Sequence, residues 1–505
     1  MITQNIIGYT LSAQSGKTIH ATDPLRQMTL PEAFSVATTE ETNLAVQKAH
    51  QAWRNYRNTS GQDRAKFLDA IATGLESLGQ ALVDRVMLET AYPEARVIVE
   101  RNRTCAQLRM WAREAIEGKW KEITLDEALP NRSPSPRPEL QMMMIPVGPV
   151  VVFGASNFPL AYSTAGGDVA SALAAGCPVI VKAHDSHLGT NALVAEVIME
   201  AARSTGMPDG VFSSINGDGF QTGRQLVTHP LTAAVGFTGS KAGGKALFDL
   251  GQQRPHPIPV FAEMGSVNPI FLLPAQVAAD PAKLATQLVT SMTMTTGQFC
   301  TNPGVLVVLD SADTDILITA LKTELEKVPP STMLTSGILN TFHRGITTIS
   351  QKESLIILKS DTSTDSSKVA PVLALTNASV FMDNSLLQEE IFGPYTIIVK
   401  CESLDEMRQV AYRIEGQLTA TIHATKEEVL YTRLLVNILM EKVGRIIING
   451  VPTGVEVCDA MTHGGPYPSS TDARFTAVGS HAIWRWLRPV TFQNFTDIGI
   501  TIEQP

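Results

Sequence analysis

The clearest candidate for chemistry in this chain is Cys300. It follows a helix-like apolar stretch and opens a turn-forming sequence, Thr-Asn-Pro-Gly, with no cysteine beside it to pair with. Loop residues on a rigid scaffold often carry catalysis, and a cysteine thiolate is a strong nucleophile. A free cysteine is more often a small hydrophobic residue. The local sequence leaves both interpretations open.

Two further polar residues follow short apolar runs. Asn157 lies in Gly-Ala-Ser-Asn-Phe-Pro, and Glu263 begins Glu-Met-Gly-Ser-Val-Asn-Pro. The asparagine amide could donate to a developing oxyanion, and the glutamate could act as a general base. Taken alone, Asn157 is more readily explained as a turn residue and Glu263 as a solvated acid.

A glycine-rich turn begins a helix at Gly236-Phe-Thr-Gly-Ser-Lys-Ala-Gly-Gly244. Such a turn presents backbone N–H groups and the positive end of the helix to a phosphate. The sequence is not the G-x-G-x-x-G fingerprint of dinucleotide-binding folds. It is equally compatible with a plain tight turn.

The elements that must position these residues alternate between short apolar strands and helices. Strands are predicted at 147–153, 178–182, 211–215, 233–237 and 259–263. This alternation of strands and helices predicts a parallel sheet covered by helices on both faces, of the dinucleotide-binding type. Asn157 and Glu263 would lie at its carboxyl edge, where open parallel sheets bind ligands.

A second α/β run follows, with strands predicted at 305–308, 395–399, 419–423 and 446–449. Before the first run, the segment 131–138 contains three prolines, which are unsuited to the interior of any element. We expect this segment to leave the globule as an arm that packs on a second subunit.

The composition narrows the class of protein. The 505 residues are enough for two or three domains, and the net charge of −9 without a basic stripe argues against nucleic-acid binding. Five scattered cysteines without a CxxC pair argue against disulfides and a zinc site, so no metal is expected. No signal peptide and no membrane-spanning run are visible. The expected location is the cytoplasm.

The motifs together resemble the aldehyde dehydrogenase superfamily over nearly the whole chain. They occur in the family's order: Gly-Ala-Ser-Asn-Phe-Pro, Phe-Thr-Gly-Ser-x-x-x-Gly, Glu-Met-Gly-Ser, Gly-Gln-Phe-Cys-Thr and Glu-Ile-Phe-Gly-Pro. The resemblance implies the family's α/β fold, with a Rossmann-like cofactor domain, an α/β catalytic domain and a small oligomerisation arm. The cofactor domain would comprise 1–119 and 144–263, the catalytic domain 264–481, and the arm 120–143 and 482–505. It also implies a homodimer or homotetramer.

The resemblance implies a role for each matching residue. Cys300 would be the nucleophile, Glu263 the general base, and Asn157 the oxyanion donor that works with the backbone N–H of Cys300. The reaction would oxidise an aldehyde to an acid through a thiohemiacetal and a thioester, with NAD or NADP as cofactor. The expected cofactor-binding residues are Lys182, Asp185, Gly239, Ser240, Gly244, Glu390 and Phe392.

Asp185 decides the expected cofactor. Acids at this place in relatives face the adenosine ribose hydroxyls, and a carboxylate there would repel the 2′-phosphate of NADP. We therefore predict a preference for NAD, with NADP possible. The alternative is that Asp185 only caps the following helix.

Departures from the common family pattern point to one branch. The chain has Gly265-Ser266-Val267 where Gly-Gly-Lys is usual, Ser156 where an aromatic residue is usual, and His-Gly-Gly-Pro-Tyr-Pro from residue 463 in place of the common C-terminal signature. These features are similar to the branch that contains α-ketoglutarate semialdehyde (2,5-dioxovalerate) dehydrogenases. The alternative substrate is a fatty (long-chain) aldehyde, which an enzyme related to the same branch oxidises.

A keto-acid substrate needs hydrogen-bond donors in the site that can bind its carboxylate. The candidates are four arginines on one predicted helix and three hydroxyl residues on the other wall: Arg101, Arg103, Arg109, Arg113, Ser469, Ser470 and Thr471. A long-chain aldehyde would need an apolar tunnel, to which Met110 and Trp111 could contribute.

Two other classes of protein compete with the dehydrogenase interpretation. A cysteine hydrolase would need a histidine base near Cys300, and none of the ten histidines lies in a motif that connects it with this thiol. A non-catalytic protein of the same fold would be expected to lack the thiol, the acid or the amide, yet all three are present.

Overall fold

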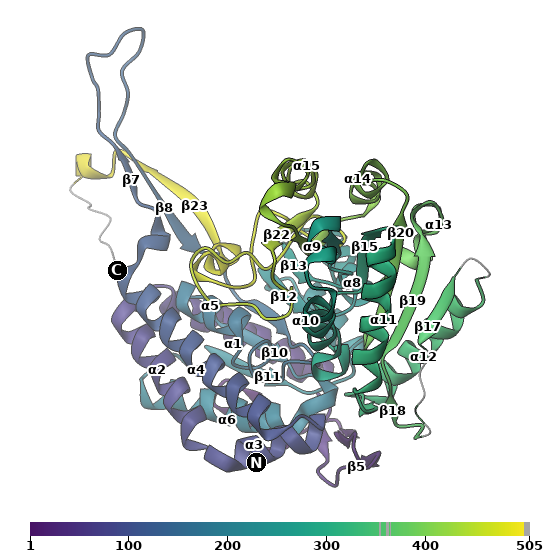
Figure 1. Ribbon diagram of the computed structural model, residues 1–505. Helices are drawn as coiled ribbons and strands as arrows, with labels where there is room; N and C mark the ends of the chain where they lie inside the picture. The colour runs from purple at the N-terminus through teal and green to yellow at the C-terminus, as the bar shows by residue number, and fades with distance from the viewer. Residues whose placement is uncertain (353–354, 360–362, 364, 499–505) are drawn as a thin grey trace.

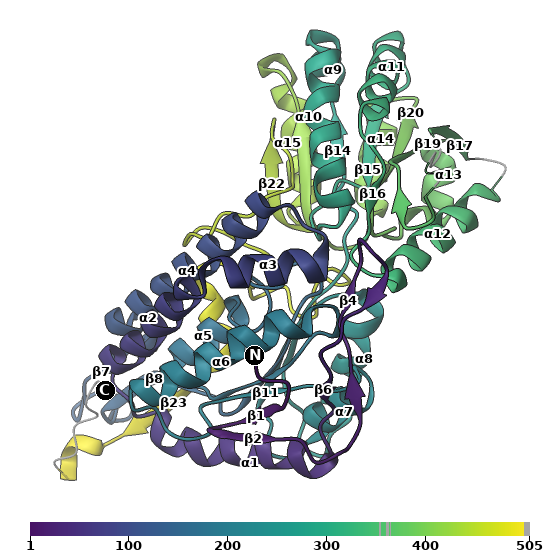
Figure 2. The same ribbon diagram turned by 90° about the horizontal axis from the view of Figure 1, so that it is seen from below.

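The computed structural model describes residues 1–352, 355–359, 363 and 365–498. In this part of the chain the strands form two large sheets, a smaller sheet in an arm, and short two-stranded pairs. The two large sheets, each with its own helices, lie one beside the other, and the arm projects away from both (Figures 1 and 2). The α/β class that the sequence predicts is confirmed.

Seven strands make up the first sheet within the described residues. Their order is β13 (Val260–Glu263), β12 (Ala234–Thr238), β9 (Val150–Phe153), β10 (Val179–Lys182), β11 (Phe212–Ile215), β1 (Asn5–Ile7) and β2 (Thr10–Ser12). The first five are parallel, and they are the five strands predicted from the sequence, each one to three residues shorter or shifted. β1 and β2 extend the sheet in the antiparallel sense.

The five parallel strands of the first sheet are largely buried, with side chains packed on both faces, which is why they lack the alternation of a half-exposed strand. Val150 and Val152 pack on one face, while Val151 and Phe153 pack on the other. The helices of the first face are α2 (Gly61–Ser77), α3 (Gly79–Thr90), α4 (Glu94–Glu117), α5 (Gly167–Ala175) and α6 (Leu188–Ser204). Those of the second face are α1 (Thr39–Tyr56), α7 (Gln221–Thr228) and α8 (Lys241–Gln252).

The second sheet also has seven strands in the described part of the chain. Their order is β17 (Ile356–Lys359), β19 (Val372–Asn377), β20 (Tyr395–Cys401), β15 (Val305–Leu309), β14 (Ile270–Leu272), β21 (Gln417–His423) and β22 (Val443–Ile448). One face packs on α9 (Pro274–Ala279), α10 (Pro281–Thr293) and α11 (Ala312–Glu326). The other packs on α12 (Ser336–Ser350), α13 (Ala378–Asp383), α14 (Leu404–Arg413) and α15 (Val429–Leu439).

The arm is a three-stranded sheet. β7 (Thr124–Asp126) pairs with β8 (Leu140–Pro146), and β23 (Leu487–Gln493) pairs with the other edge of β8. The proline-rich segment 131–138 forms the tip of the long loop between β7 and β8, which projects from the molecule at the upper left of Figure 1. Of the expected arm segment 482–505, residues 499–505 lie outside the described residues, and the three-domain division stays a prediction.

The remaining strands form short pairs: β3 (Thr18–Ile19) with β6 (Phe34–Ser35), β4 (Thr22–Asp23) with β5 (Met28–Thr29), and β16 (Ser331–Thr332) with β18 (Lys368–Val369). Among the described residues, we find no helix with both the length and the apolar character that crossing a membrane would require.

Candidate active site

Cys300 lies on a tightly held loop between α10 and β15. The 3-10 turn before it, Met294–Gly297, contains Thr295 and Thr296 in the left-handed region. A Cβ on Gly297 would lie 2.4 Å from the backbone of Gly393, so only glycine permits this close approach. The turn therefore brings the thiol to a defined place between the two large sheets.

Two asparagines hold the loop from either side. Asn157, which follows β9, donates from Nδ2 to the carbonyl oxygen of Gln298 at 3.0 Å. Asn268 donates from its own Nδ2 to the carbonyl oxygens of Cys300 and Asn302, each at 2.9 Å. The backbone on both sides of the thiol is therefore fixed by side chains from other segments.

Ser266 takes part in the same network. Its hydroxyl lies 3.0 Å from Oδ1 of Asn268 and 2.8 Å from Oε1 of Gln417, and it accepts from the N–H of Leu418. The serine that replaces the family's usual glycine thus connects Asn268, and through it the Cys300 loop, to β21.

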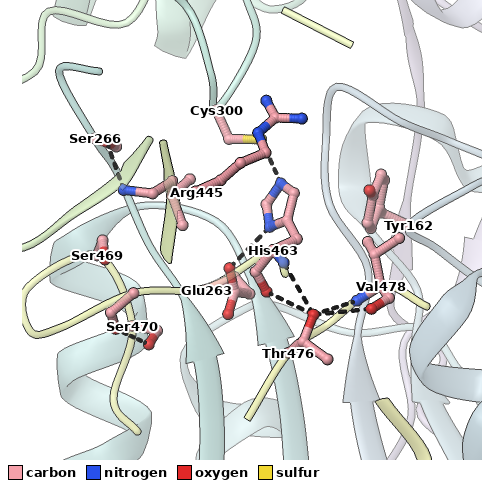
Figure 3. Close-up of polar contacts among 12 residues, drawn as sticks. Tyr162, Glu263, Ser266, Cys300, Arg445, His463, Ser469, Ser470, Thr476 and Val478 are labelled. Carbon is pink, nitrogen blue, oxygen red and sulfur yellow. Dashed lines mark hydrogen bonds and ion pairs between the residues drawn. The ribbon is translucent and has the colours of Figure 1, made fainter. Parts of the chain in front are cut away.

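A histidine joins the thiol to the acid. Nε2 of His463 lies 3.4 Å from Sγ of Cys300, and Nδ1 lies 3.0 Å from Oε2 of Glu263, at the end of β13 (Figure 3). No sequence motif connects a histidine with Cys300, yet the structure places His463 beside its thiol. The two residues are 163 positions apart, and a loop without regular periodicity carries the histidine, so no local pattern connects them.

Burial and charge act in opposite directions on the imidazole. Burial alone would lower the pKa of His463, but the negative charges available on Cys300 and Tyr162, with the hydrogen bonds to Cys300 and Glu263, raise that pKa well above its ordinary value. His463 is 5% exposed and Glu263 7% exposed, so the imidazole and the carboxyl group are largely out of water. The site favours an imidazolium next to the sulphur.

The segment that carries His463 returns to the first sheet. The backbone N–H of Met264 donates to the carbonyl oxygen of Ser469, and that of Thr471 to the carbonyl oxygen of Ala262. Thr476 accepts from the N–H of His463 at 2.9 Å. Residues 462–471, called the strap below, thus run along the edge of β13.

The hydroxyl groups of the strap are already engaged. Those of Ser469, Ser470 and Thr471 donate to the carbonyl oxygens of Pro466, Gly465 and Val260, respectively. Ser469 is fully buried. Their place in the structure does not support the expected role in binding a substrate carboxylate.

Two cavities lie at the carboxyl edge of the first sheet, on either side of the start of α8. One, of about 370 Å³, is lined by residues that include Asn157, Gly239, Ser240, Glu263, Cys300, Glu390 and Phe392. The other, of about 520 Å³, is lined by residues that include Phe153, Lys182, Asp185, Phe220, Arg224, Gly243 and Leu250. The structure therefore brings six of the seven expected cofactor residues to these cavities.

The seventh, Gly244, lines neither cavity and lies instead against β13 and the residue that follows it. A Cβ at this position would lie 2.7 Å from the Met264 side chain and 3.1 Å from that of Ala262. This glycine lets α8 pack closely on β13, while its neighbour Gly243 faces the cavity. Ser240 caps α8 by accepting from the N–H of Gly243.

The residues of the two cavities fit a dinucleotide. Nζ of Lys182 lies 2.6 Å from Oδ1 of Asp185, which places a cation and an acceptor together in the larger cavity. The start of α8 offers N–H groups suited to a pyrophosphate between the cavities. The smaller cavity contains the thiol. A ligand with two ring systems joined by phosphates matches this arrangement.

Glu390 has an unusual environment. Its side chain lines the smaller cavity. Desolvation by the surrounding protein disfavours the charged carboxylate and raises the pKa of this group to about 8. A Cβ on Gly265 would lie 2.1 Å from Oε2 of Glu390, so glycine is needed at residue 265 to admit this side chain.

The candidate arginines of α4 have separate surroundings. Arg109 forms a two-bond ion pair with Glu76 on the surface. Arg103 donates to the hydroxyl of Tyr162 at 3.0 Å, beside His463. Arg445 on β22, which is not among the arginines predicted from the sequence, lies next to Cys300 (Figure 3).

Comparisons with known proteins agree with this geometry. The family model described as "Aldehyde dehydrogenase family" matches residues 10–489. The chain is 44% identical over 494 residues to "Alpha-ketoglutaric semialdehyde dehydrogenase 2" of Azospirillum brasilense, which covers 97% of this chain and 94% of that protein. It is 44% identical over 467 residues to "Alpha-ketoglutaric semialdehyde dehydrogenase" of Acinetobacter baylyi, covering 92% and 88%.

Solved structures share the fold at lower sequence identity. Betaine aldehyde dehydrogenase from Staphylococcus aureus in complex with NAD+ superposes with a TM-score of 0.84 and 19% identity, covering 97% of this chain and 94% of that one. A 1-pyrroline-5-carboxylate dehydrogenase from Thermus with bound NAD gives a TM-score of 0.82 and 19% identity, covering 97% and 92%.

Proposed function

Because this chain belongs to the aldehyde dehydrogenase family, we propose that it oxidises α-ketoglutarate semialdehyde to α-ketoglutarate. The chain is an oxidoreductase that acts on aldehydes, as its motifs predicted. The keto-acid substrate is supported by the names of the two relatives that are 44% identical to it. The observation that carries the mechanism is the chain of contacts from Cys300 through His463 to Glu263.

The first step is activation of the thiol. Cys300 gives its proton to Nε2 of His463, and Glu263 accepts the hydrogen bond from Nδ1 and stabilises the imidazolium that forms. The thiolate then forms a C–S bond to the aldehyde carbon, and the carbonyl electrons move to oxygen. Asn157 uses one N–H to hold Gln298, and its second N–H is available to this oxyanion together with the backbone N–H of Cys300.

The cofactor would be held by Lys182, Asp185, Gly239, Ser240, Glu390 and Phe392 in the two cavities, and when bound it accepts the hydride from the thiohemiacetal carbon. The product on Cys300 is a thioester. His463 first loses to solvent the proton that it took from Cys300. The His463–Glu263 pair then takes a proton from the water that attacks the thioester, and the released thiolate is ready for another cycle.

The cofactor is proposed to be NAD rather than NADP. The support for this choice is Asp185, which places a carboxylate in the larger cavity, where it would repel a 2′-phosphate. We also propose a homodimer or homotetramer that assembles through the arm. A cytoplasmic location suits a mechanism that needs a free thiol.

The long-chain aldehyde alternative has less support. Met110 and Trp111, the residues expected to line an apolar tunnel, are buried in the hydrophobic core between α4 and its neighbours. They pack the scaffold, and neither lines the cavity that contains Cys300.

An assay of aldehyde oxidation tests the proposal. Reduced nicotinamide is followed by absorbance with α-ketoglutarate semialdehyde, butanal and decanal as substrates. The expected result is a kcat/KM highest for the semialdehyde and no turnover in Cys300→Ala. A higher kcat/KM for decanal would favour the long-chain alternative, and full activity in Cys300→Ala would overturn the mechanism.

A further inference from the structure

Arg445 lies on the edge strand of the second sheet and points toward the active site. Its neighbour Ile446 packs into the core on one face of β22, so the arginine, one residue earlier, points to the opposite face. Its guanidinium group lies beside the sulphur of Cys300 (Figure 3). Arg445 lines neither of the two cofactor-side cavities. It therefore approaches the thiol from the side on which a substrate must enter.

The guanidinium group is held in place by neutral partners. Nη2 donates to the carbonyl oxygen of Pro452 at 2.6 Å and Nη1 to that of Gly454 at 3.0 Å. Nε is buried and has no partner in the described structure. No carboxylate of the described residues lies within ion-pair distance of this arginine. Its charge is therefore uncompensated by any fixed anion except a thiolate on Cys300.

Burial of an unpaired cation is costly, and two opposing effects act on the pKa of Arg445. Partial burial lowers the pKa of Arg445, while negative charge on Cys300 and Tyr162 raises it. An arginine keeps its charge in proteins, and a guanidinium fork matches the two oxygens of a carboxylate. An anion bound from the substrate side would satisfy the free N–H groups.

A second arginine lies nearby. Arg103 of α4 donates to the hydroxyl of Tyr162 at 3.0 Å and stacks over its ring, and that ring faces His463 at 6.0 Å between centroids. Arg103 also has no carboxylate partner within the described part of the chain. The approach to Cys300 thus carries two unpaired cations, and the buried acid Glu263 is already engaged with His463.

We propose that Arg445 binds the carboxylate of the substrate and selects short ω-oxo acids over uncharged aldehydes. This inference rests on the proposed function, because it names the group that recognises the acid end of the proposed substrate. It places recognition on β22, on an element different from the helix whose arginines the sequence suggested.

The first test compares a charged with an uncharged substrate. The ratio of kcat/KM for α-ketoglutarate semialdehyde to that for butanal should fall about 10- to 150-fold in Arg445→Met, the range expected for losing a hydrogen bond to a charged group. Arg445→Lys should retain part of the ratio. Arg109→Met, which removes a surface arginine paired with Glu76, is the matched control and should retain all of it. An unchanged ratio in Arg445→Met would overturn the proposal.

The second test needs neither cofactor nor turnover. Iodoacetate and iodoacetamide alkylate the same thiolate but differ in charge, so the ratio of their rates reports the attraction of a carboxylate to the site. Cys458 is the exposed cysteine of the described chain, so the measurement uses a Cys458→Ala background. The ratio of iodoacetate to iodoacetamide rates should exceed that of a free thiol such as glutathione and should fall in Arg445→Met.

The two tests separate the possible failures. If both reagents react more slowly by the same factor in Arg445→Met, the arginine acts on the thiol alone and the inference is wrong. If no aldehyde is oxidised but the alkylation ratio depends on Arg445, the proposed function fails while the anion site stands. Because each ratio is measured within one protein, partial misfolding of a variant changes both rates equally.

Discussion

At the scale of single residues, the active site differs from a simple pairing of thiol and base. Glu263 faces His463, and His463 faces Cys300, so a base of raised pKa lies between the expected nucleophile and the expected general base. The imidazole is the group within reach of the thiol proton. The carboxylate acts on the sulphur only through it.

This geometry predicts the effect of His463→Gln. Without the imidazole, the Cys300 thiol loses the proton acceptor that lies 3.4 Å from its sulphur, so alkylation by iodoacetamide should slow and kcat should fall about 10²- to 10⁴-fold. Rates are measured in the Cys458→Ala background at pH 7. His481→Gln, an exposed histidine, serves as the control. Alkylation at the wild-type rate in His463→Gln would contradict the proposed proton transfer.

Glu390 predicts a pH dependence of stability. Its pKa is raised from an ordinary 4.5 to about 8, so between these values the folded protein holds a proton that the unfolded chain has lost. The wild type should therefore lose stability as the pH rises from about 4.5 to about 8. Glu390→Gln removes this loss, so the difference in Tm between variant and wild type should grow over the same window and then level off. A difference independent of pH would show that the carboxyl group titrates normally.

Asp185 predicts the choice of cofactor. In Asp185→Ala the carboxylate that would repel a 2′-phosphate is absent, so the ratio of kcat/KM for NAD to that for NADP should fall. Asp313→Ala, an exposed acid on α11, should leave the ratio unchanged. Equal ratios in the wild type and Asp185→Ala would show that Asp185 serves only the local structure around Lys182.

At the scale of elements, glycines allow the strap to pass between the two large sheets. A Cβ on Gly444 of β22 would lie 2.1 Å from the carbonyl oxygen of Gly464, and one on Gly416 would lie 2.0 Å from that of Pro466. Both contacts are with backbone, which cannot rotate away. The absence of two side chains thus sets the position of the strap, and the strap sets the position of His463.

Gly444→Ala is therefore expected to be destabilising. The added methyl group must displace the strap, at a cost of about 1–3 kcal/mol in the free energy of unfolding, typical of overpacking. Alkylation of Cys300 should slow as well, because Gly464 is adjacent to His463. Urea unfolding measures the first effect. Gly337→Ala on α12, whose Cβ has only one atom within 4 Å, should not lower stability. Equal stability of the two variants would contradict this account of the strap.

At the scale of the whole molecule, the arm presents apolar side chains to solvent. Leu125 on β7 is 58% exposed and Leu129, on the loop that follows, is 42% exposed. Exposed apolar residues on a projecting sheet are typical of a surface that another subunit covers. The proposed homo-oligomer would bury them.

The corresponding variant is Leu125→Asp/Leu129→Asp. Two carboxylates in the interface should dissociate the oligomer, which light scattering after size exclusion would detect as a lower mass. Leu25→Asp, an exposed leucine on the turn between β4 and β5, should keep the mass of the wild type. An oligomer that survives the arm substitutions would assign its interface elsewhere.

The sequence by itself determined the scaffold and most of the cofactor side. The five parallel strands were predictable because strands buried on both faces appear as short apolar runs. Asn157, Glu263 and the start of α8 follow such strands directly, so their place at one sheet edge follows from local order. Cys300 was identified by its neighbours in the chain in the same way.

Only the tertiary structure decided which side chains meet at the sulphur. His463 lies on a loop with no periodicity, and its position depends on hydrogen bonds to β13 and on glycines more than fifteen residues away. Arg445 sits in an apolar strand sequence, where alternation predicts a face but not the neighbour across it. Contacts between segments this far apart arise from packing of the two sheets, and no local pattern encodes them.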